Sequence, residues 1–124
     1  MMIFTSDRNK CVEIKSSSLW SSLFELSTEI LSEEDKEFLQ YAVSFLNTGV
    51  CVTDDAQITA RQLELTKRRF AKHSPPSVPI RFVNETATSC ADLFITMDGK
   101  DLFDGLINLL KYADKTSVDV FIER

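Results

Sequence analysis

The sequence predicts an α+β protein, a single domain over residues 1–124 in which three to four helices pack on a small mixed β-sheet. Its length of 124 residues matches one ordinary domain. A composition of 44% hydrophobic and 27% charged residues is typical of a globular protein with its own core. Stretches with helical spacing of apolar residues stand between short β-branched or aromatic runs, which predicts both helices and strands.

The N-terminal segment predicts a β-hairpin followed by a helix. Met2–Thr5 and Cys11–Lys15 are short strand candidates, and the polar turn Ser6–Asn9 joins them. Three serines at positions 16–18 then offer helix N-caps. Residues at spacings of three and four predict one buried face of this helix: Leu19, Trp20, Leu23, Phe24, Ser27, Ile30 and Leu31.

A second helix is expected between Ser32 and Gly49. Ser32 is a suitable N-cap, and acidic residues fill the first turn after it, as in a capping box. Gly49 suits the position after the last turn, where the backbone adopts the left-handed conformation. The predicted buried face contains Phe38, Leu39, Ala42, Val43, Phe45 and Leu46. The first two helices are therefore expected to form an αα-hairpin.

A third, basic helix is expected in the middle of the chain. Val50–Val52 is either an extended link or a short strand, and Thr53 with two following aspartates opens the helix. Lys67 interrupts the expected buried stripe, which consists of Ala56, Ala60, Leu63 and Phe70. A serine and two prolines at positions 74–76 end the helix, because proline cannot continue its hydrogen bonds. Val78–Val83 predicts a strand at a sheet edge, since a proline lies near its start.

The last third of the chain predicts a strand, a helix and a second strand. Leu93–Thr96 and Val118–Ile122 are the strand candidates, and about 30 residues in all is the length of a βαβ unit. Asp98 is the expected N-cap, with Asp101 three residues on as an acidic variant of the capping box. The apolar face of this helix contains Leu102, Phe103, Leu106, Leu109, Leu110 and Ala113.

The charge of the chain limits its partners. A net charge of −5 disfavours nucleic-acid binding, which depends on a basic surface, and favours a basic partner, although many soluble proteins are mildly acidic. Residues 1–50 and 90–124 are net acidic, whereas residues 51–89 are net basic. The basic helix from Arg61 to Lys72 either touches RNA or pairs with the protein's own acidic segments, and the overall charge favours the pairing.

The cysteines and the N-terminus predict a cytoplasmic protein. Cys11, Cys51 and Cys90 are widely spaced and odd in number, which favours buried free thiols in a reducing compartment. The first residues lack the basic and apolar regions of a signal peptide. No apolar run approaches the roughly 20 residues that a membrane span requires, so no membrane association is expected.

No catalytic, cofactor or metal site is expected, and the protein is predicted not to be an enzyme. His73 is the only histidine and follows the basic helix, where a histidine commonly meets the last carbonyls. The chain has no P-loop, no dinucleotide fingerprint, no nucleophile elbow and no metal-ligand spacing. Asp98 and Asp101 form a possible carboxylate pair, but helix capping explains both more simply.

The candidate binding residues are the acidic residues at the starts of two predicted helices. Glu33, Glu34, Asp35 and Glu37 form the densest acidic run of the chain. This run is either a solvated first helical turn or an anionic patch that docks on a basic protein surface such as a nuclease active site. Asp101 and Asp104 open the last helix in the same way.

One segment resembles a known family. Residues 94–113, FITMDGKDLFDGLINLLKYA, resemble a segment of small immunity proteins from bacterial polymorphic-toxin and contact-dependent growth inhibition systems. There a T-x-D-G-x-D-L run opens an amphipathic helix near the C-terminus. Residues 49–80 are similar too, with a glycine, an acidic cap, a helix and prolines before a strand. The resemblance implies a cytoplasmic, non-catalytic protein that binds and neutralises one toxin domain.

These observations lead to one hypothesis and two alternatives. The protein is expected to bind a basic toxin domain, with a nuclease as the favoured class, and to be a monomer or weak dimer when free. The residues predicted to contact the toxin are Glu33, Glu34, Asp35, Glu37, Asp101 and Asp104. The leading alternative is a small acidic secretion chaperone, a class that is usually dimeric and holds an extended effector segment. A small enzyme is the third possibility.

Overall fold

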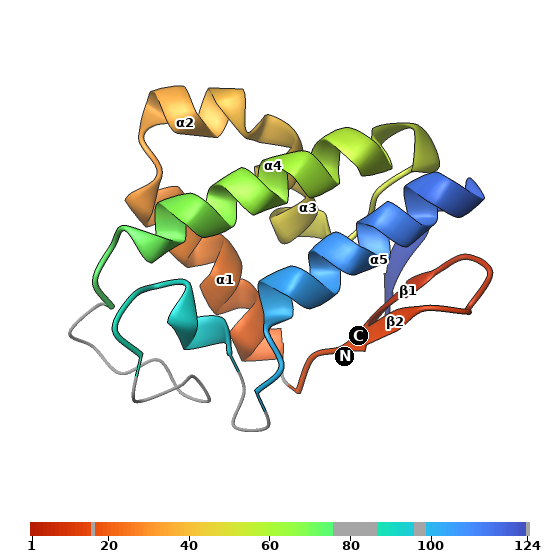
Figure 1. Ribbon diagram of the computed structural model, residues 1–124, viewed down its shortest axis with the longest axis horizontal. Helices are drawn as coiled ribbons and strands as arrows, with labels where there is room; N and C mark the ends of the chain where they lie inside the picture. The colour runs from red at the N-terminus through yellow and green to blue at the C-terminus, as the bar shows by residue number, and fades with distance from the viewer. Residues whose placement is uncertain (16, 76–86, 96–98, 124) are drawn as a thin grey trace.

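Helices form most of the computed structural model, which describes residues 1–15, 17–75, 87–95 and 99–123 (Figure 1). In these residues the elements are β1 (Met2–Thr5), β2 (Cys11–Glu13), α1 (Ser17–Ile30), α2 (Glu33–Phe38), α3 (Gln40–Thr48), α4 (Thr53–Ala71), a 3₁₀-helix (Asp92–Phe94), α5 (Leu102–Thr116) and β3 (Val120–Glu123). The predicted α+β class is confirmed. The described part contains five α-helices rather than three or four.

The sheet has the order β2-β1-β3, and both strand pairs described are antiparallel. The expected mixed sheet is therefore not found in the described residues. The reason is that Leu93 and Phe94, the first residues of the predicted strand, lie in the 3₁₀-helix. The described residues before α5 therefore supply no strand for a βαβ unit. The predicted strand Val78–Val83 lies outside the described residues. Helix α5 leads instead into β3, which pairs with β1.

The predicted N-terminal hairpin is confirmed, and its side chains alternate between two faces. Ile3 and Thr5 are fully buried, whereas Met2 is exposed. The turn is tied to α5 because Asp7 accepts hydrogen bonds from the Thr5 hydroxyl at 2.6 Å and the Tyr112 hydroxyl at 2.7 Å. These hydrogen bonds lower the pKa of Asp7 below its ordinary value.

The expected second helix is two helices with a break at Leu39. Ser32 caps α2 as predicted, accepting a hydrogen bond from the Asp35 N–H at 3.1 Å. Leu39 then leaves helical geometry and is buried, with 1% of its surface exposed, while its neighbour Phe38 is 62% exposed. The prediction that Phe38 is part of the core is therefore wrong. The break is stabilised by Gln62 of α4, whose Oε1 accepts from two N–H groups in the first turn of α3, those of Tyr41 and Ala42.

Gly49 ends α3 in the left-handed conformation, as predicted, with φ of 70°. Only glycine fits there for a second reason as well. A Cβ at this position would lie 2.6 Å from Ile122 Cδ1, closer than non-bonded carbon atoms approach. Of the two expectations for Val50–Val52, an extended link or a short strand, the structure shows the link. Cys51 alone forms an isolated β-bridge, in which it exchanges backbone hydrogen bonds with Val120.

Helices α4 and α5 pack side by side, with α2 beyond α4 on the other side (Figure 1). Their buried faces meet in an aromatic cluster in which the ring centroids of Phe70 and Phe103 are 5.1 Å apart and Phe94 of the 3₁₀-helix contacts both. This packing explains why Leu93 and Phe94 are both buried, a pattern that an alternating strand would not give.

The N-cap of helix α5 lies three residues later than predicted. The residue at the N-cap is Asp101, whose Oδ1 accepts from the Asp104 N–H at 3.4 Å. The prediction that Asp98 is the cap is wrong, and Asp98 itself lies outside the described residues. The predicted apolar face of the helix is confirmed, since all six of its residues are buried.

Candidate functional site

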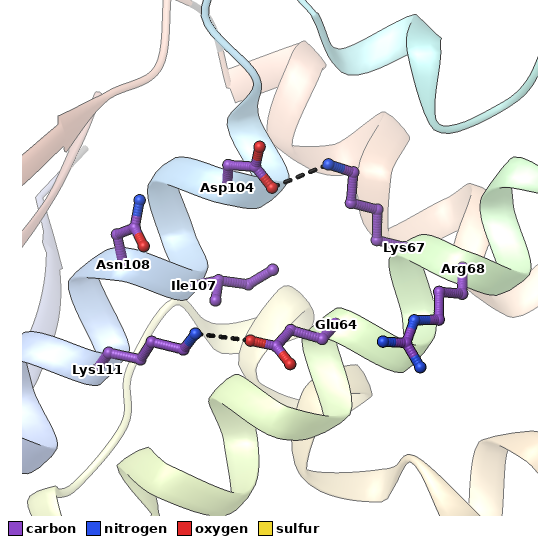
Figure 2. Close-up of a pocket in the computed structure, with 7 residues that line it drawn as sticks. All are labelled: Glu64, Lys67, Arg68, Asp104, Ile107, Asn108 and Lys111. Carbon is purple, nitrogen blue, oxygen red and sulfur yellow. Dashed lines mark hydrogen bonds and ion pairs between the residues drawn. The ribbon is translucent and has the colours of Figure 1, made fainter.

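The seam between α4 and α5 is lined by paired charges (Figure 2). Lys67 Nζ of α4 lies 2.8 Å from Asp101 Oδ2 and 2.8 Å from Asp104 Oδ1. Further along the seam, Lys111 Nζ of α5 lies 2.8 Å from Glu64 Oε1 of α4. The basic helix thus pairs with an acidic helix start of the same chain, which is the arrangement that the charge distribution favoured.

Lys67 is the cation that the two aspartates share. Burial of its ammonium group disfavours the charged form, but the hydrogen bonds and charges of Asp101 and Asp104 outweigh this effect and raise the pKa of Lys67. The side chain of Asp101 is only 14% exposed, whereas that of Asp104 is exposed. Water therefore screens the ion pair between Lys67 and Asp101 less than the ion pair between Lys67 and Asp104. Both carboxylates therefore support the fold.

A shallow hollow of about 430 Å³ lies along this seam. The residues that line it are those of Figure 2: Glu64, Lys67, Arg68, Asp104, Ile107, Asn108 and Lys111. A smaller hollow of about 290 Å³ continues past Glu64 and Lys111. Most charges that line the first hollow already have an opposite charge beside them, so the seam offers little uncompensated charge to a ligand.

The acidic run of α2 is arranged differently. Only Asp35 reaches α4, where its Oδ2 lies 3.3 Å from Arg69 Nε, close enough for an ion pair but not oriented for a hydrogen bond. Glu33 pairs with Lys36 on its own helix at 3.2 Å and remains 92% exposed. Glu34 and Glu37 are exposed and form no ion pair within the part of the chain that the structure describes.

Two aromatic side chains accompany these acids. Phe38 ends α2 with 62% of its surface exposed, and Tyr41 in the first turn of α3 is 38% exposed. No residue of α2 is buried, so the helix lies on the surface of the core rather than within it. We define the α2 surface as Glu33, Glu34, Glu37, Phe38 and Tyr41.

The six predicted contact residues therefore do not form one site. Asp101 and Asp104 meet on Lys67, Asp35 turns towards Arg69, and only Glu33, Glu34 and Glu37 remain as exposed acids on α2. The apolar spacing wrongly placed Phe38 on the buried face but left Tyr41 off it, and it identified neither ring as a binding residue. No periodicity signal separates exposed Phe38 from buried Leu39, because both are apolar and adjacent.

The remaining chemistry-bearing residues are dispersed. Cys51 and Cys90 are buried free thiols as predicted, and burial raises the pKa of each, but Cys11 is exposed, which contradicts its predicted burial. Among the residues described, no three His, Cys, Asp or Glu side chains gather as metal ligands would. None of the described helices combines the length and hydropathy that a transmembrane helix requires.

Comparison with known protein families, characterised proteins and solved structures finds no significant match to this chain.

Proposed function

We propose that the protein is an immunity protein that binds a folded bacterial toxin domain in the cytoplasm and neutralises it by covering its active site or substrate surface. The observation that carries the proposal is the α2 surface, where exposed acids without partners outside their own helix stand beside two exposed aromatic rings. The resemblance of residues 94–113 to immunity proteins supports the same class of function.

The α2 surface has the composition of a binding hot spot. Aromatic side chains at the centre of an interface contribute much of its affinity when they enter a pocket on the partner. Acidic residues around them attract a basic surface, speed the encounter and fix the orientation of the complex. A specific interface buries about 800 Å² on each partner, so the α2 surface would form its centre and neighbouring residues of α3 and α4 its rim.

The basic partner is proposed to be a nuclease domain, because enzymes that cut nucleic acids carry a positive substrate surface. An immunity protein bound to this surface excludes the substrate without catalysing any reaction. Neutralisation is then stoichiometric, and no catalytic residue is required in the immunity protein. Asp101 and Asp104 are not proposed as contacts, since both already pair with Lys67 of the same chain.

The direct test is to express the C-terminal domain of the exoprotein encoded immediately upstream, with and without this protein. We expect the domain to be toxic alone, co-expression to restore growth, and inhibition of the purified domain to saturate near one equivalent. The matched control is a variant with Phe38→Ala and Glu34→Lys, which should fold but protect poorly. Absence of such an upstream gene, or protection with sub-stoichiometric protein, would contradict the proposal.

Solution measurements separate this proposal from the secretion-chaperone alternative. An immunity protein should bind the folded domain and remain a monomer or weak dimer when free. A stable dimer that binds an unfolded effector segment and ignores the folded domain would replace the immunity function by a chaperone function. Sedimentation of the free protein and titration with folded and denatured partner provide both answers.

A further inference from the structure

Gln62 of α4 supplies the first turn of α3 with a hydrogen-bond acceptor from a different helix. Its Oε1 accepts from the Tyr41 N–H at 2.8 Å and from the Ala42 N–H at 3.1 Å. The first N–H groups of a helix have no acceptor within it, and the N-cap side chain usually provides one. Leu39 is the N-cap of α3 and forms no side-chain cap hydrogen bond. Gln62 therefore caps α3 from outside.

The same two N–H groups would have other acceptors in an unbroken helix. If one helix ran from α2 through Leu39 into α3, the N–H groups of Tyr41 and Ala42 would donate to the carbonyls four residues before them. The side chain of Gln62 competes with these carbonyls. It thereby favours the observed break, at which the backbone of Leu39 has φ of −103° and ψ of 27°.

The break decides where Phe38 lies. In an unbroken helix Phe38 would share a face with Ala42 and Phe45, because residues four and seven positions apart lie on the same side of a helix. Ala42 and Phe45 are both buried, whereas the ring of Phe38 is 62% exposed. The apolar spacing by itself thus favours an unbroken helix with Phe38 turned inward. Exposure of Phe38 depends on the break, which is the conformation that Gln62 stabilises.

A second contact from α4 holds α2 at the surface. Arg69 lies seven residues after Gln62, two turns along the same side of α4, and its Nε is 3.3 Å from Asp35 Oδ2 of α2. None of the residues of α2 is buried, so apolar packing does not fix the direction of this helix. Polar contacts from one side of α4 therefore reach both sides of the break.

From these contacts we propose that Gln62 is a positioning residue of the toxin-binding site. It holds the break between α2 and α3 and thereby presents Phe38 to the toxin domain. The inference rests on the proposed function, because it assigns Gln62 a role in binding through the α2 surface. Gln62 itself is only 9% exposed and acts through the residues that it holds. A break that is already formed in the free protein spares the complex the cost of ordering these residues on binding.

The test compares two variants that differ in whether the side chain at position 62 carries an acceptor. Gln62→Met gives an unbranched side chain without an oxygen atom. Gln62→Glu keeps an acceptor, and its negative charge is favourable beside the N-terminus of a helix. Gln57→Met controls for the substitution itself, because Gln57 is exposed on the same helix.

The first measurement needs no toxin. The Cα chemical shift of Leu39 distinguishes a helical from a non-helical backbone at that residue. We expect a non-helical shift in wild type, Gln62→Glu and Gln57→Met, and a change towards the helical value in Gln62→Met. A helical shift in the wild type, or an unchanged shift in Gln62→Met, would overturn the proposal. If Gln62→Met does not fold, Gln62→Asn takes its place, because the shorter side chain withdraws its oxygen from both N–H groups.

The second measurement is the affinity for the toxin domain by isothermal titration. We expect Gln62→Met to bind at least about tenfold more weakly than wild type, as when an aromatic hot-spot residue is lost, and the other two variants to bind within about threefold of it. A role confined to stability would lower the urea midpoint of Gln62→Met but leave its affinity unchanged, which would overturn the proposal. If wild type binds no toxin domain, the proposed function fails, and the shift of Leu39 alone decides whether Gln62 holds the break.

Discussion

The two acidic helix starts of this protein have similar sequences and different structural roles. At the start of α5, Asp101 caps the helix and shares Lys67 with Asp104, so both charges are used within the fold. At the start of α2, Glu34 and Glu37 have no ion-pair partner in the described residues, and an exposed phenylalanine follows them. The α5 start supports stability, and the α2 start is available for binding.

The difference arises from what lies opposite each helix. Helix α4 runs along α5 closely enough for Lys67 and Glu64 to reach its charges across the seam. Helix α2 is linked to α4 by the ion pair between Asp35 and Arg69, and none of the residues of α2 is buried. An acidic first turn by itself therefore indicates a helix start and nothing more. Its role depends on whether a basic neighbour compensates it.

The largest expected effect is a difference in stability between substitutions at two neighbouring residues, Phe38 and Leu39. Leu39→Ala should lower the free energy of unfolding by about 2–5 kcal/mol, because it removes a fully buried side chain. Phe38→Ala should change it by less than about 0.5 kcal/mol, because that ring is exposed. Urea denaturation measures both. Similar destabilisation by the two substitutions would mean that Phe38 is part of the core.

The same Phe38→Ala variant should weaken toxin binding although its fold is intact. Truncation of an aromatic hot-spot residue costs about 2 kcal/mol or more of binding free energy, which corresponds to a loss of affinity of at least tenfold. Isothermal titration against the upstream toxin domain provides the measurement, with exposed Ile58 of α4 truncated to Ala as the control. If both variants bind like wild type, Phe38 lies outside the interface.

A smaller effect is expected at the shared lysine of the seam. Lys67→Met should lower the free energy of unfolding by about 1 kcal/mol, since it leaves Asp101 and Asp104 uncompensated beside each other. Lys36→Met on α2 is the matched control and should cost almost nothing, because Glu33 is exposed. If the two substitutions lowered the free energy of unfolding equally, the proposed difference in role between the starts of α2 and α5 would be wrong.

The pH dependence of this contribution has a definite sign. The two aspartates raise the pKa of Lys67 in the folded protein above its ordinary value of 10.5. The contribution is therefore complete below that value and disappears as the pH rises through the raised pKa. The stability difference between wild type and Lys67→Met should be constant from pH 7 to 9 and shrink above pH 10.5. A difference that grows at alkaline pH would contradict the assignment.

Local chemistry allowed much of the fold to be predicted from the sequence. Ser32 caps the start of α2, and Gly49 ends α3, because these residue types suit helix ends in any protein. The apolar residues of α5 recur over enough turns to identify its buried face. The pairing of the basic helix with acidic segments followed from the uneven charge. These signals need only residues that are close in the sequence, or a simple charge balance.

The remaining features depend on contacts between distant residues. Leu39 breaks its helix where Gln62, from another helix, supplies the acceptor for the next turn. Leu93 and Phe94 have strand-like composition but lie in a 3₁₀-helix, where Phe94 joins an aromatic cluster with Phe70 and Phe103. For the candidate site, the acids were recognised but not which of them α4 would compensate. That choice depends on the position of Lys67 in space.

The central claim is that the exposed acids of α2, and not the acids of α5 that pair with Lys67, attract the partner. Its most direct test is the association rate with the toxin domain across a salt series, measured by stopped-flow fluorescence. The test variant carries Glu33→Lys, Glu34→Lys and Glu37→Lys. The control carries Glu25→Lys, Glu29→Lys and Asp114→Lys, which are exposed elsewhere. Both change the net charge from −5 to +1, because each reversal adds two positive charges.

We expect the α2 variant to associate at least tenfold more slowly than the control at low salt and to lose most of its salt dependence, because salt screens exposed charges over about 8 Å at physiological ionic strength. The control should retain most of the wild-type rate and a similar slope. If the two variants show the same rate and the same salt slope, the acids of α2 are only a solvated helix start and the claim is wrong.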